Sequence, residues 1–209
     1  MVADIRLQGK RGQSDTAECG CSEYRATLEN GAVYRRLALV KICIVSDSHD
    51  RADALERAVK DAAAEGARVV VHCGDLIGAQ TLRPALSAGL PMHLIHGNNV
   101  GDSIALHNMS RASGGLLHYY GPDARLDLGG RKIFLVHYPE YGHAMACTGN
   151  WDLVCCGHSH QAAIEQIATV KGGSTWLVNP GTIAGLAAPA TWMLGDLETM
   201  RFDLHTLAL

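Results

Sequence analysis

The sequence predicts a mixed α/β protein with two sheets and helices on the outside. From Val40 onward, apolar runs of strand character alternate with helical segments, which is typical of parallel βαβ units. Beyond residue 115, closely spaced strand-like runs follow one another instead, and the glycine pairs Gly129-Gly130 and Gly172-Gly173 mark turns between them. At 209 residues, the chain is long enough for one sizeable core and too short for two comfortable domains.

The first half supplies the alternating elements. Residues 37–45 form a continuous apolar run, broken only by Lys41, which predicts a buried strand. Residues 51–65 carry apolar side chains on one helical face, and Gly66 supplies a stop. The segments that follow are predicted in order as strand, helix and strand, over residues 68–73, 79–87 and 91–96.

The second half is richer in strands. The runs at 116–120, 124–128 and 132–137 predict three strands, and residues 140–148 predict a short helix. Further strands are predicted at residues 153–156, 162–169, 175–179, 191–197 and 201–206. Loops gather at the strand ends, and ligands of open α/β sheets bind beyond the carboxyl ends of the strands.

Residues 1–39 differ from the rest, because they show no sustained period of 2 or 3.6 residues. Three alternatives stay open for this N-terminal extension: an ordered arm, a disordered leader, or a non-native addition from the choice of start site. Residues 40–209 are predicted to form the complete domain. Cys19 and Cys21 are too closely spaced for a zinc-ribbon pair, and no partner pair follows.

The amino-acid composition limits the kinds of partner that the protein can bind. A formal net charge of −3 gives no basic footprint for a stable nucleic-acid partner, although nucleotides remain candidate substrates. No apolar run approaches bilayer length, and the opening segment MVADIRLQGKRGQSD lacks the apolar core of a secretory signal. Several of the seven cysteines lie in apolar strand-like runs, where a free thiol acts as a small hydrophobe. We therefore expect a cytoplasmic protein with no membrane partner.

Polar residues follow five of the apolar strands at their carboxyl ends. These residues are Asp47, His49, Asp75, Asn98, Asn99, His137, His158 and His160. Each has an ordinary alternative role: an Asp or Asn at a strand end can cap the next helix, and a single His is more often a core residue than a ligand. Five strand ends of this kind in one chain are hard to explain by capping or packing alone.

The residue types indicate a metal centre. Carboxylate, imidazole and amide donors together suit divalent manganese, iron or zinc. Seven donors are too many for one tetrahedral site but suit two metals that share a carboxylate. The spacing of two in Asp47/His49 and His158/His160 places both members of a pair on one side of an extended segment.

The order Asp-x-His, Gly-Asp, Gly-Asn, His and Gly-His-x-His resembles the calcineurin-like metallophosphoesterase family, and most of all its small single-domain bacterial and archaeal phosphodiesterase branch. The likeness runs from about Val40 to the C-terminus, and residues 179–182, Asn-Pro-Gly-Thr, resemble the turn after the last ligand loop of that family. The resemblance implies a four-layer αββα sandwich of two mixed sheets flanked by helices, with two divalent metal ions.

By position, the resemblance assigns Asp47, His49 and His160 to the first metal and Asn98, His137 and His158 to the second. It assigns Asp75 as the ligand that bridges the two metals. The catalytic residues implied are Asp75, Asn98, Asn99 and His137.

Two positions depart from the pattern of the family. Asn99 stands where many members have His, Cys or Asp, and His137-Tyr138-Pro139 replaces the common His-Gly-His. Both departures affect residues expected near the substrate.

The predicted function is hydrolysis of small phosphodiesters or nucleotides by a metal-activated hydroxide, with Mn²⁺ expected ahead of Fe, Zn or Ni. A protein-binding scaffold on the same fold is the alternative, and the complete ligand set argues against it. A phosphomonoesterase would keep the same site and change only the substrate pocket. A homo-oligomer is compatible with the sequence.

Overall fold

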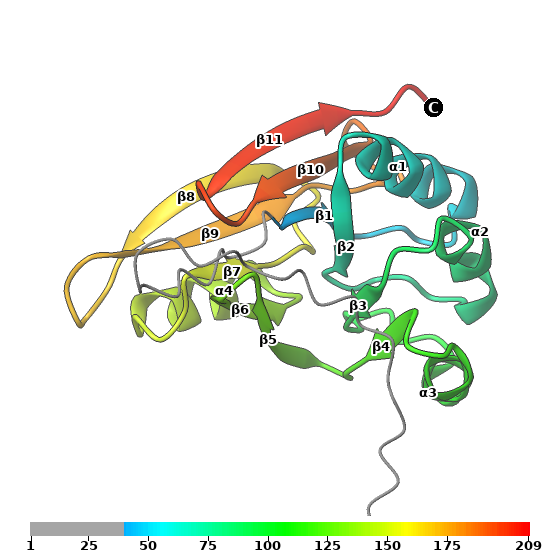
Figure 1. The fold of residues 1–209 in the computed structure, drawn as a ribbon, viewed down its shortest axis with the longest axis horizontal. Coiled ribbons are helices and arrows are strands. Elements are labelled where there is room, and N and C mark those ends of the chain that lie inside the picture. Colours follow the sequence, from blue (N-terminus) through cyan, green and yellow to red (C-terminus); the bar gives the residue numbers. More distant parts are fainter. Residues whose placement is uncertain (1–39) are drawn as a thin grey trace, which may run out of the picture. The chain divides into compact units, whose positions relative to one another are not determined.

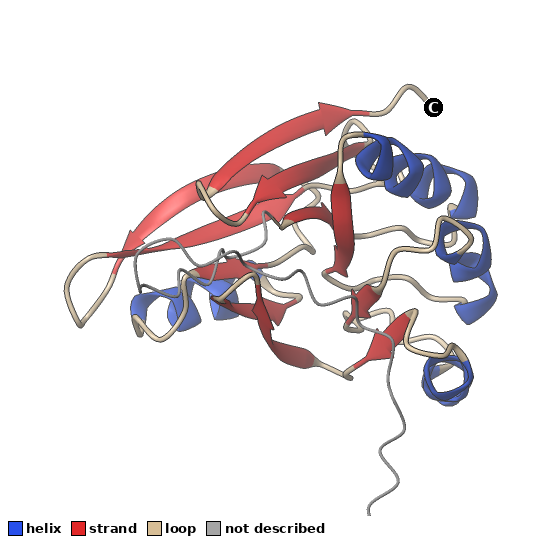
Figure 2. Cartoon of the chain, in the orientation of Figure 1, coloured by secondary structure: helices blue, strands red, loops and turns tan. Residues whose placement is uncertain are grey.

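The computed structural model describes residues 40–209 and has the predicted fold class (Figure 1). Two mixed sheets are flanked by helices, as expected for an αββα sandwich. Helices α1, α2 and α3 lie on one side of the sheets and α4 on the other (Figure 2). The predicted extension 1–39, including Cys19 and Cys21, lies outside the described residues.

The first sheet has six strands in the order β11-β10-β1-β2-β3-β4. Strands β1 to β4 run parallel, whereas β10 pairs antiparallel with both β1 and β11. The strands are β1 Lys41–Val45, β2 Ala67–His72, β3 Met92–Leu94, β4 Leu117–Tyr119, β10 Thr191–Asp196 and β11 Arg201–Thr206.

The second sheet has five strands in the order β5-β6-β7-β9-β8. The glycine pair at residues 129–130 turns β5 back onto β6, as predicted, and β6, β7 and β9 run parallel. The strands are β5 Asp123–Leu128, β6 Arg131–Val136, β7 Leu153–Cys155, β8 Ala162–Ala168 and β9 Ser174–Pro180.

Strand alternation in β1 explains the layers. Because successive side chains point to opposite faces, Ile42 and Ile44 enter the core between the two sheets, whereas Cys43 and Val45 pack under the helices of the first sheet. Those helices are α1 Ala52–Ala64, α2 Leu82–Leu86 and α3 Ser103–Ala112, with a 3₁₀ turn η1 at Ala79–Thr81. A third, smaller core lies between the second sheet and α4 Pro139–Cys147.

Helix α3 was not predicted. Within it only Leu106 is buried, so the apolar periodicity is weak. The available signal was Asp102, whose side chain accepts a hydrogen bond from the backbone N of Ala105 at 2.8 Å and caps the helix. The predicted third strand was also too long, since β3 ends at Leu94 and leaves Asn98 in the loop.

In the part of the chain that the structure describes, none of the helices has the length and apolar character needed to cross a membrane.

Candidate metal centre

The loops that follow β1, β2, β3, β6 and β7 bring the predicted ligands together. The Nε2 atom of His160 lies 3.3 Å from Asp47 Oδ1, and the Nε2 atom of His49 lies 3.8 Å from the same oxygen. Asp47 therefore belongs to one cluster with His49 and His160, and to a second cluster with Asp75 and His137.

Asp75 belongs to the second cluster and faces one histidine of each cluster with a different oxygen. Its Oδ1 lies 3.4 Å from His137 Nε2, and its Oδ2 lies 3.8 Å from His49 Nε2. The Asp75 side chain is almost fully buried, at 3% exposed. Two carboxylate oxygens directed at two separate histidines are the arrangement that a bridging ligand needs.

Asp47 carries an unpaired oxygen in the interior. Its side chain is fully buried, and Oδ2 accepts a hydrogen bond from the backbone N of His158 at 3.0 Å. Oδ1 has no hydrogen-bond partner among the described residues. A buried carboxylate oxygen without a partner is costly, so this atom fits a metal ion as its missing neighbour.

The orientation of two histidines exposes lone pairs. His137 Nδ1 lies 2.8 Å from Cys73 O, and His160 Nδ1 lies 2.9 Å from Leu186 O. A carbonyl oxygen only accepts, so each Nδ1 carries the proton and donates it. Each Nε2 is then left as an acceptor, as in histidines that bind metals and donate their other N–H to a backbone carbonyl.

The His137 lone pair faces two other acceptors. Its Nε2 lies 3.2 Å from Asn98 Oδ1 and 3.4 Å from Asp75 Oδ1. The Nε2 atom of His160 lies 3.3 Å both from Asp47 Oδ1 and from His49 Nε2. Acceptor atoms gathered as closely as those around His137 and Asp47 fit a cation or an additional proton between them.

The backbone around the ligands is unusual. Five of the predicted ligands have positive φ: Asp47 at 53°, His49 at 41°, Asp75 at 56°, His158 at 67° and His160 at 58°. Residues other than glycine adopt this region rarely, although Asp, Asn and His tolerate it best. Such strained positions cluster at functional sites, where the surrounding structure maintains them.

Hydrogen bonds between loops maintain this backbone. Asp47 N donates to Gly74 O at 2.9 Å, and His49 N donates to Asp75 O at 3.0 Å, so the first two ligand loops pair directly. Thr182 Oγ1 donates to Asp47 O at 2.9 Å from the Asn-Pro-Gly-Thr turn that the sequence singled out. The turn therefore fixes the first ligand loop.

The same turn also holds the Gly-His-x-His loop. Asn179 Nδ2 donates to Gly157 O at 2.8 Å and to Ser159 Oγ at 3.0 Å. The Asn179 Oδ1 accepts from the backbone N of Gly181 at 3.0 Å. Asn179 is a supporting residue that the site prediction did not include, and its position in the resembling turn was the available signal.

His72, the last residue of β2, is a second supporting residue that the site prediction did not include. Gly74 N donates to its Nδ1 at 3.2 Å, so the proton lies on Nε2, which donates to Ser48 Oγ at 3.0 Å. Burial lowers the pKa of His72 to about 3, with a smaller contribution from the neighbouring His137, so the ring is neutral. His72 thereby connects the first two ligand loops.

Glycines allow the loops to approach closely. A Cβ atom at Gly97 would collide with Asp75 Oδ1 and lie 2.6 Å from His137 Nε2. At Gly74, with φ of 106°, it would lie 2.7 Å from His137 Nδ1. Both positions therefore require glycine for the ligand side chains to meet.

The remaining predicted residues lie on the outer side of the centre. Asn98, Asn99 and His158 are exposed. The His158 ring packs against the His137 ring, with centroids 5.2 Å apart, and is not part of either cluster. Asn99 lies on Asp75, donating from its side-chain Nδ2 to Oδ2 at 2.6 Å, so its amide faces a predicted ligand.

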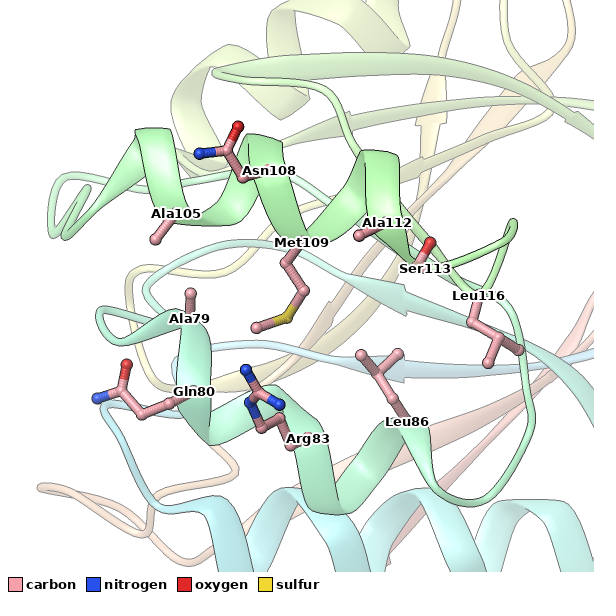
Figure 3. Close-up of a pocket in the computed structure, with 10 residues that line it drawn as sticks. All are labelled: Ala79, Gln80, Arg83, Leu86, Ala105, Asn108, Met109, Ala112, Ser113 and Leu116. Carbon is pink, nitrogen blue, oxygen red and sulfur yellow. The ribbon is translucent and has the colours of Figure 1, made fainter.

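Two cavities differ in their relation to these residues. A cavity of about 470 Å³ includes His137 and Gly97 in its lining and therefore opens at the ligand cluster. A larger groove of about 770 Å³ lies between α2 and α3 (Figure 3). Leu86, Met109 and Leu116 line that groove, and its lining includes no predicted ligand.

Comparison with known proteins identifies the family. Residues 40–200 match the family model described as the calcineurin-like phosphoesterase superfamily domain. The chain belongs to this superfamily. It is accordingly a phosphoric ester hydrolase, and the resemblance stated from the ligand order is confirmed.

Individual relatives are small and match almost end to end. A phosphodiesterase of Methanocaldococcus jannaschii is 24% identical over 176 residues, covering 81% of this chain and 99% of the relative. The solved structure of an archaeal phosphodiesterase superposes with a TM-score of 0.73 at 22% identity, covering 80% of this chain and all of that one. A structure from Thermus thermophilus gives a TM-score of 0.59 at 16% identity, covering 80% of this chain and 99% of that one.

Proposed function

We propose that the protein is a dinuclear, metal-dependent phosphodiesterase that hydrolyses small phosphodiesters or nucleotides. One observation carries the proposal: the Nε2 atoms of His137, His160 and His49 converge on the oxygens of Asp47 and Asp75, and Asp47 Oδ1 has no partner in the described part of the chain. The relative in M. jannaschii that matches almost end to end is named a phosphodiesterase, which supports a diester as substrate.

Asp47, His49 and His160 would hold one ion, and Asn98, His137 and His158 the other, with Asp75 shared. The mixture of carboxylate, imidazole and amide donors suits Mn²⁺, Fe, Zn or Ni, and we propose Mn²⁺ as the first choice. When bound, two such cations neutralise phosphoryl charge and lower the pKa of the attacking water.

The protein itself positions the ligand side chains. Cys73 O and Leu186 O hold the His137 and His160 rings with Nε2 inward, and Asn99 fixes Asp75. In the reaction, the oxygen of water bonds to phosphorus, the ester P–O bond breaks, and the leaving oxygen takes a proton. Asn99 can orient an oxygen but cannot supply that proton, because an amide is not a general acid.

The proposal places the enzyme in the cytoplasm. The five cysteines in the described part of the chain, residues 43, 73, 147, 155 and 156, are free, and all but Cys147 are buried. Free buried thiols fit a reducing compartment.

The test reloads metal-free protein with Mn, Ni, Zn, Mg or Fe and assays a panel of phosphodiesters and phosphomonoesters, with bound metal measured in parallel. We expect diester hydrolysis to be restored by Mn²⁺ and to be lost in His160→Ala. Faster hydrolysis of monoesters than of matched diesters would favour the phosphomonoesterase. Bound metal without hydrolysis of either class would contradict the proposal and favour the binding scaffold.

A further inference from the structure

The cavity of about 470 Å³ beside the metal centre has aromatic walls. Tyr138 and Tyr141 meet edge to face, with ring centroids 5.5 Å apart and an interplanar angle of 68°. Phe134, Val136, Met145 and Pro122 form the rest of the apolar lining. The volume lies within the range of small-molecule sites, which is about 300–1,000 Å³.

Local sequence explains why these side chains share one wall. Pro139 holds Tyr138 in an extended conformation, with φ of −83° and ψ of 127°, and begins α4 at its first turn. Tyr141 and Met145 are then four residues apart and lie on one face of α4. Tyr138 occupies the position at which the common family pattern has glycine, so its ring adds to the wall a side chain that this pattern lacks.

The cavity reaches the ligand cluster directly. His137 belongs both to the lining and to the cluster with Asp47 and Asp75. The Tyr138 ring also packs against the His158 ring, with centroids 4.7 Å apart. A group held against Tyr138 would therefore lie beside a phosphate at the metal centre, close enough to be its ester group.

The charges of the lining residues limit which chemical group the cavity can bind. The lining includes Asp123, which is exposed, and no lysine or arginine of the described chain. Burial, with a smaller contribution from His137, lowers the pKa of the lining residue His96, which favours its neutral form. A further phosphate in this cavity would therefore meet the Asp123 carboxylate and neither a lysine nor an arginine, which is unfavourable. A neutral group fits better than a polyphosphate chain.

The two tyrosine rings favour an aromatic group. Tyr141 borders the apolar cavity and is 59% exposed, so its ring is accessible to a ligand. Stacking of a planar ring on tyrosine contributes beyond simple burial, and tyrosine loses little conformational entropy on binding.

We propose that this cavity binds a neutral planar aromatic ester group of the substrate, an aryl or nucleobase moiety, by stacking on Tyr138 and Tyr141. The inference rests on the proposed phosphodiesterase function, since the phosphate is held at the metal centre. It adds a substrate class: diesters of aromatic or nucleoside alcohols rather than alkyl diesters or nucleoside polyphosphates.

The test compares the binding of phenylphosphonate and methylphosphonate to metal-loaded full-length protein by calorimetry. The two probes share a non-hydrolysable phosphonate and differ only in the aromatic group. We expect wild type to prefer phenylphosphonate, and Tyr141→Ala to reduce the ratio of the two affinities by about 2- to 10-fold. Tyr141→Phe keeps the ring and should keep the ratio.

Leu116→Ala is the matched control, because it shortens an apolar side chain in the other cavity, the groove between α2 and α3 (Figure 3). It should leave the ratio unchanged. A ratio that falls in Leu116→Ala and not in Tyr141→Ala would assign phenyl binding to that groove and overturn the proposal. Equal loss of both probes in Tyr141→Ala would also overturn it, because the loss would then not depend on the ring.

Measuring diester hydrolysis with the same proteins distinguishes failure of this inference from failure of the proposed function. If wild type hydrolyses diesters but Tyr141→Ala keeps the phenyl preference, only the aromatic site is wrong. If no diester is hydrolysed while the phenyl preference depends on Tyr141, the aromatic site stands and the phosphodiesterase assignment fails.

Discussion

Asn99 donates two hydrogen bonds to Asp75, one to each carboxylate oxygen. The backbone N reaches Oδ1 at 2.9 Å, and the side-chain Nδ2 reaches Oδ2 at 2.6 Å. Asn99 thereby fixes the rotation of the carboxylate whose two oxygens face His137 and His49. The residue that departs from the family pattern is thus placed to orient the proposed bridging ligand.

Asp75→Asn should weaken both proposed metal sites, because it removes the shared negative charge. We expect activity to fall by more than about 100-fold, the upper range for changes to residues that only support metal ligands. The loss should exceed that of Asn98→Ala or His160→Ala, each of which affects one site. Steady-state kinetics with elemental analysis of the same samples measures both effects, and a variant that keeps wild-type metal content would contradict a shared role.

Gly97→Ala should reduce metal affinity by at least about tenfold, because its Cβ would collide with Asp75 Oδ1. Competition with a chromophoric chelator measures the affinity, and thermal unfolding of metal-free protein reports stability. Gly114→Ala is the control: its φ of 62° makes alanine strained, but no atom of the described chain lies within 4 Å of the added Cβ. That control should lower the Tm and leave metal affinity intact, so equal affinity losses in both variants would show a general folding defect.

The leaving group provides a third prediction. Because Asn99 cannot donate a proton, kcat/KM for a series of aryl phosphodiesters should fall steeply as the pKa of the leaving phenol rises. Asn99→His should flatten this dependence if the imidazole reaches the leaving oxygen, and general acid catalysis is worth about 10²–10⁴-fold for poor leaving groups.

His143 is the alternative acid in this series. Its Nδ1 lies 3.7 Å from Cys147 Sγ along the exposed side of α4, so we expect His143→Ala to leave the dependence unchanged. A shallow dependence in wild type that becomes steep only in His143→Ala would identify His143 as the acid.

Acid should destabilise the metal-free protein through His72. Its pKa is about 3 in the folded chain against 6.5 ordinarily. Between these values the unfolded chain binds the extra proton, so this residue makes the free energy of unfolding fall as pH drops from 6.5 toward 3. Urea unfolding at about pH 7 and about pH 5 should show a smaller drop in His72→Gln than in wild type. The same drop in both proteins would contradict the role of His72, and His107→Gln, on exposed α3, is the control.

Sequence patterns predicted the fold where periodicity was strong. The described part of the apolar run 37–45 contains β1, and the amphipathic face of residues 51–65 became α1. Helix α3 was missed because its single buried residue, Leu106, gives almost no period. Its cap at Asp102 was a weaker signal than the hydrophobic pattern of the other helices.

For the site, the sequence could predict which side chains meet but not the backbone groups that orient them. Strand-end positions indicated which residues meet, and the structure brings Asp47, His49, Asp75, His137 and His160 together. The groups that orient them are backbone carbonyls of Cys73 and Leu186. Every residue has a carbonyl, so sequence gives no signal for such partners. The link from His72 to Ser48 joins residues 24 apart and depends on the parallel pairing of β1 and β2.

A crystal structure of the Mn²⁺-loaded protein, with anomalous difference density at the manganese edge, tests the central claim most directly. The dinuclear proposal predicts two peaks about 3.5–4 Å apart, with Asp75 in contact with both and Asp47 Oδ1 on one of them. A single peak, or two peaks with Asp75 turned away from either, would contradict it.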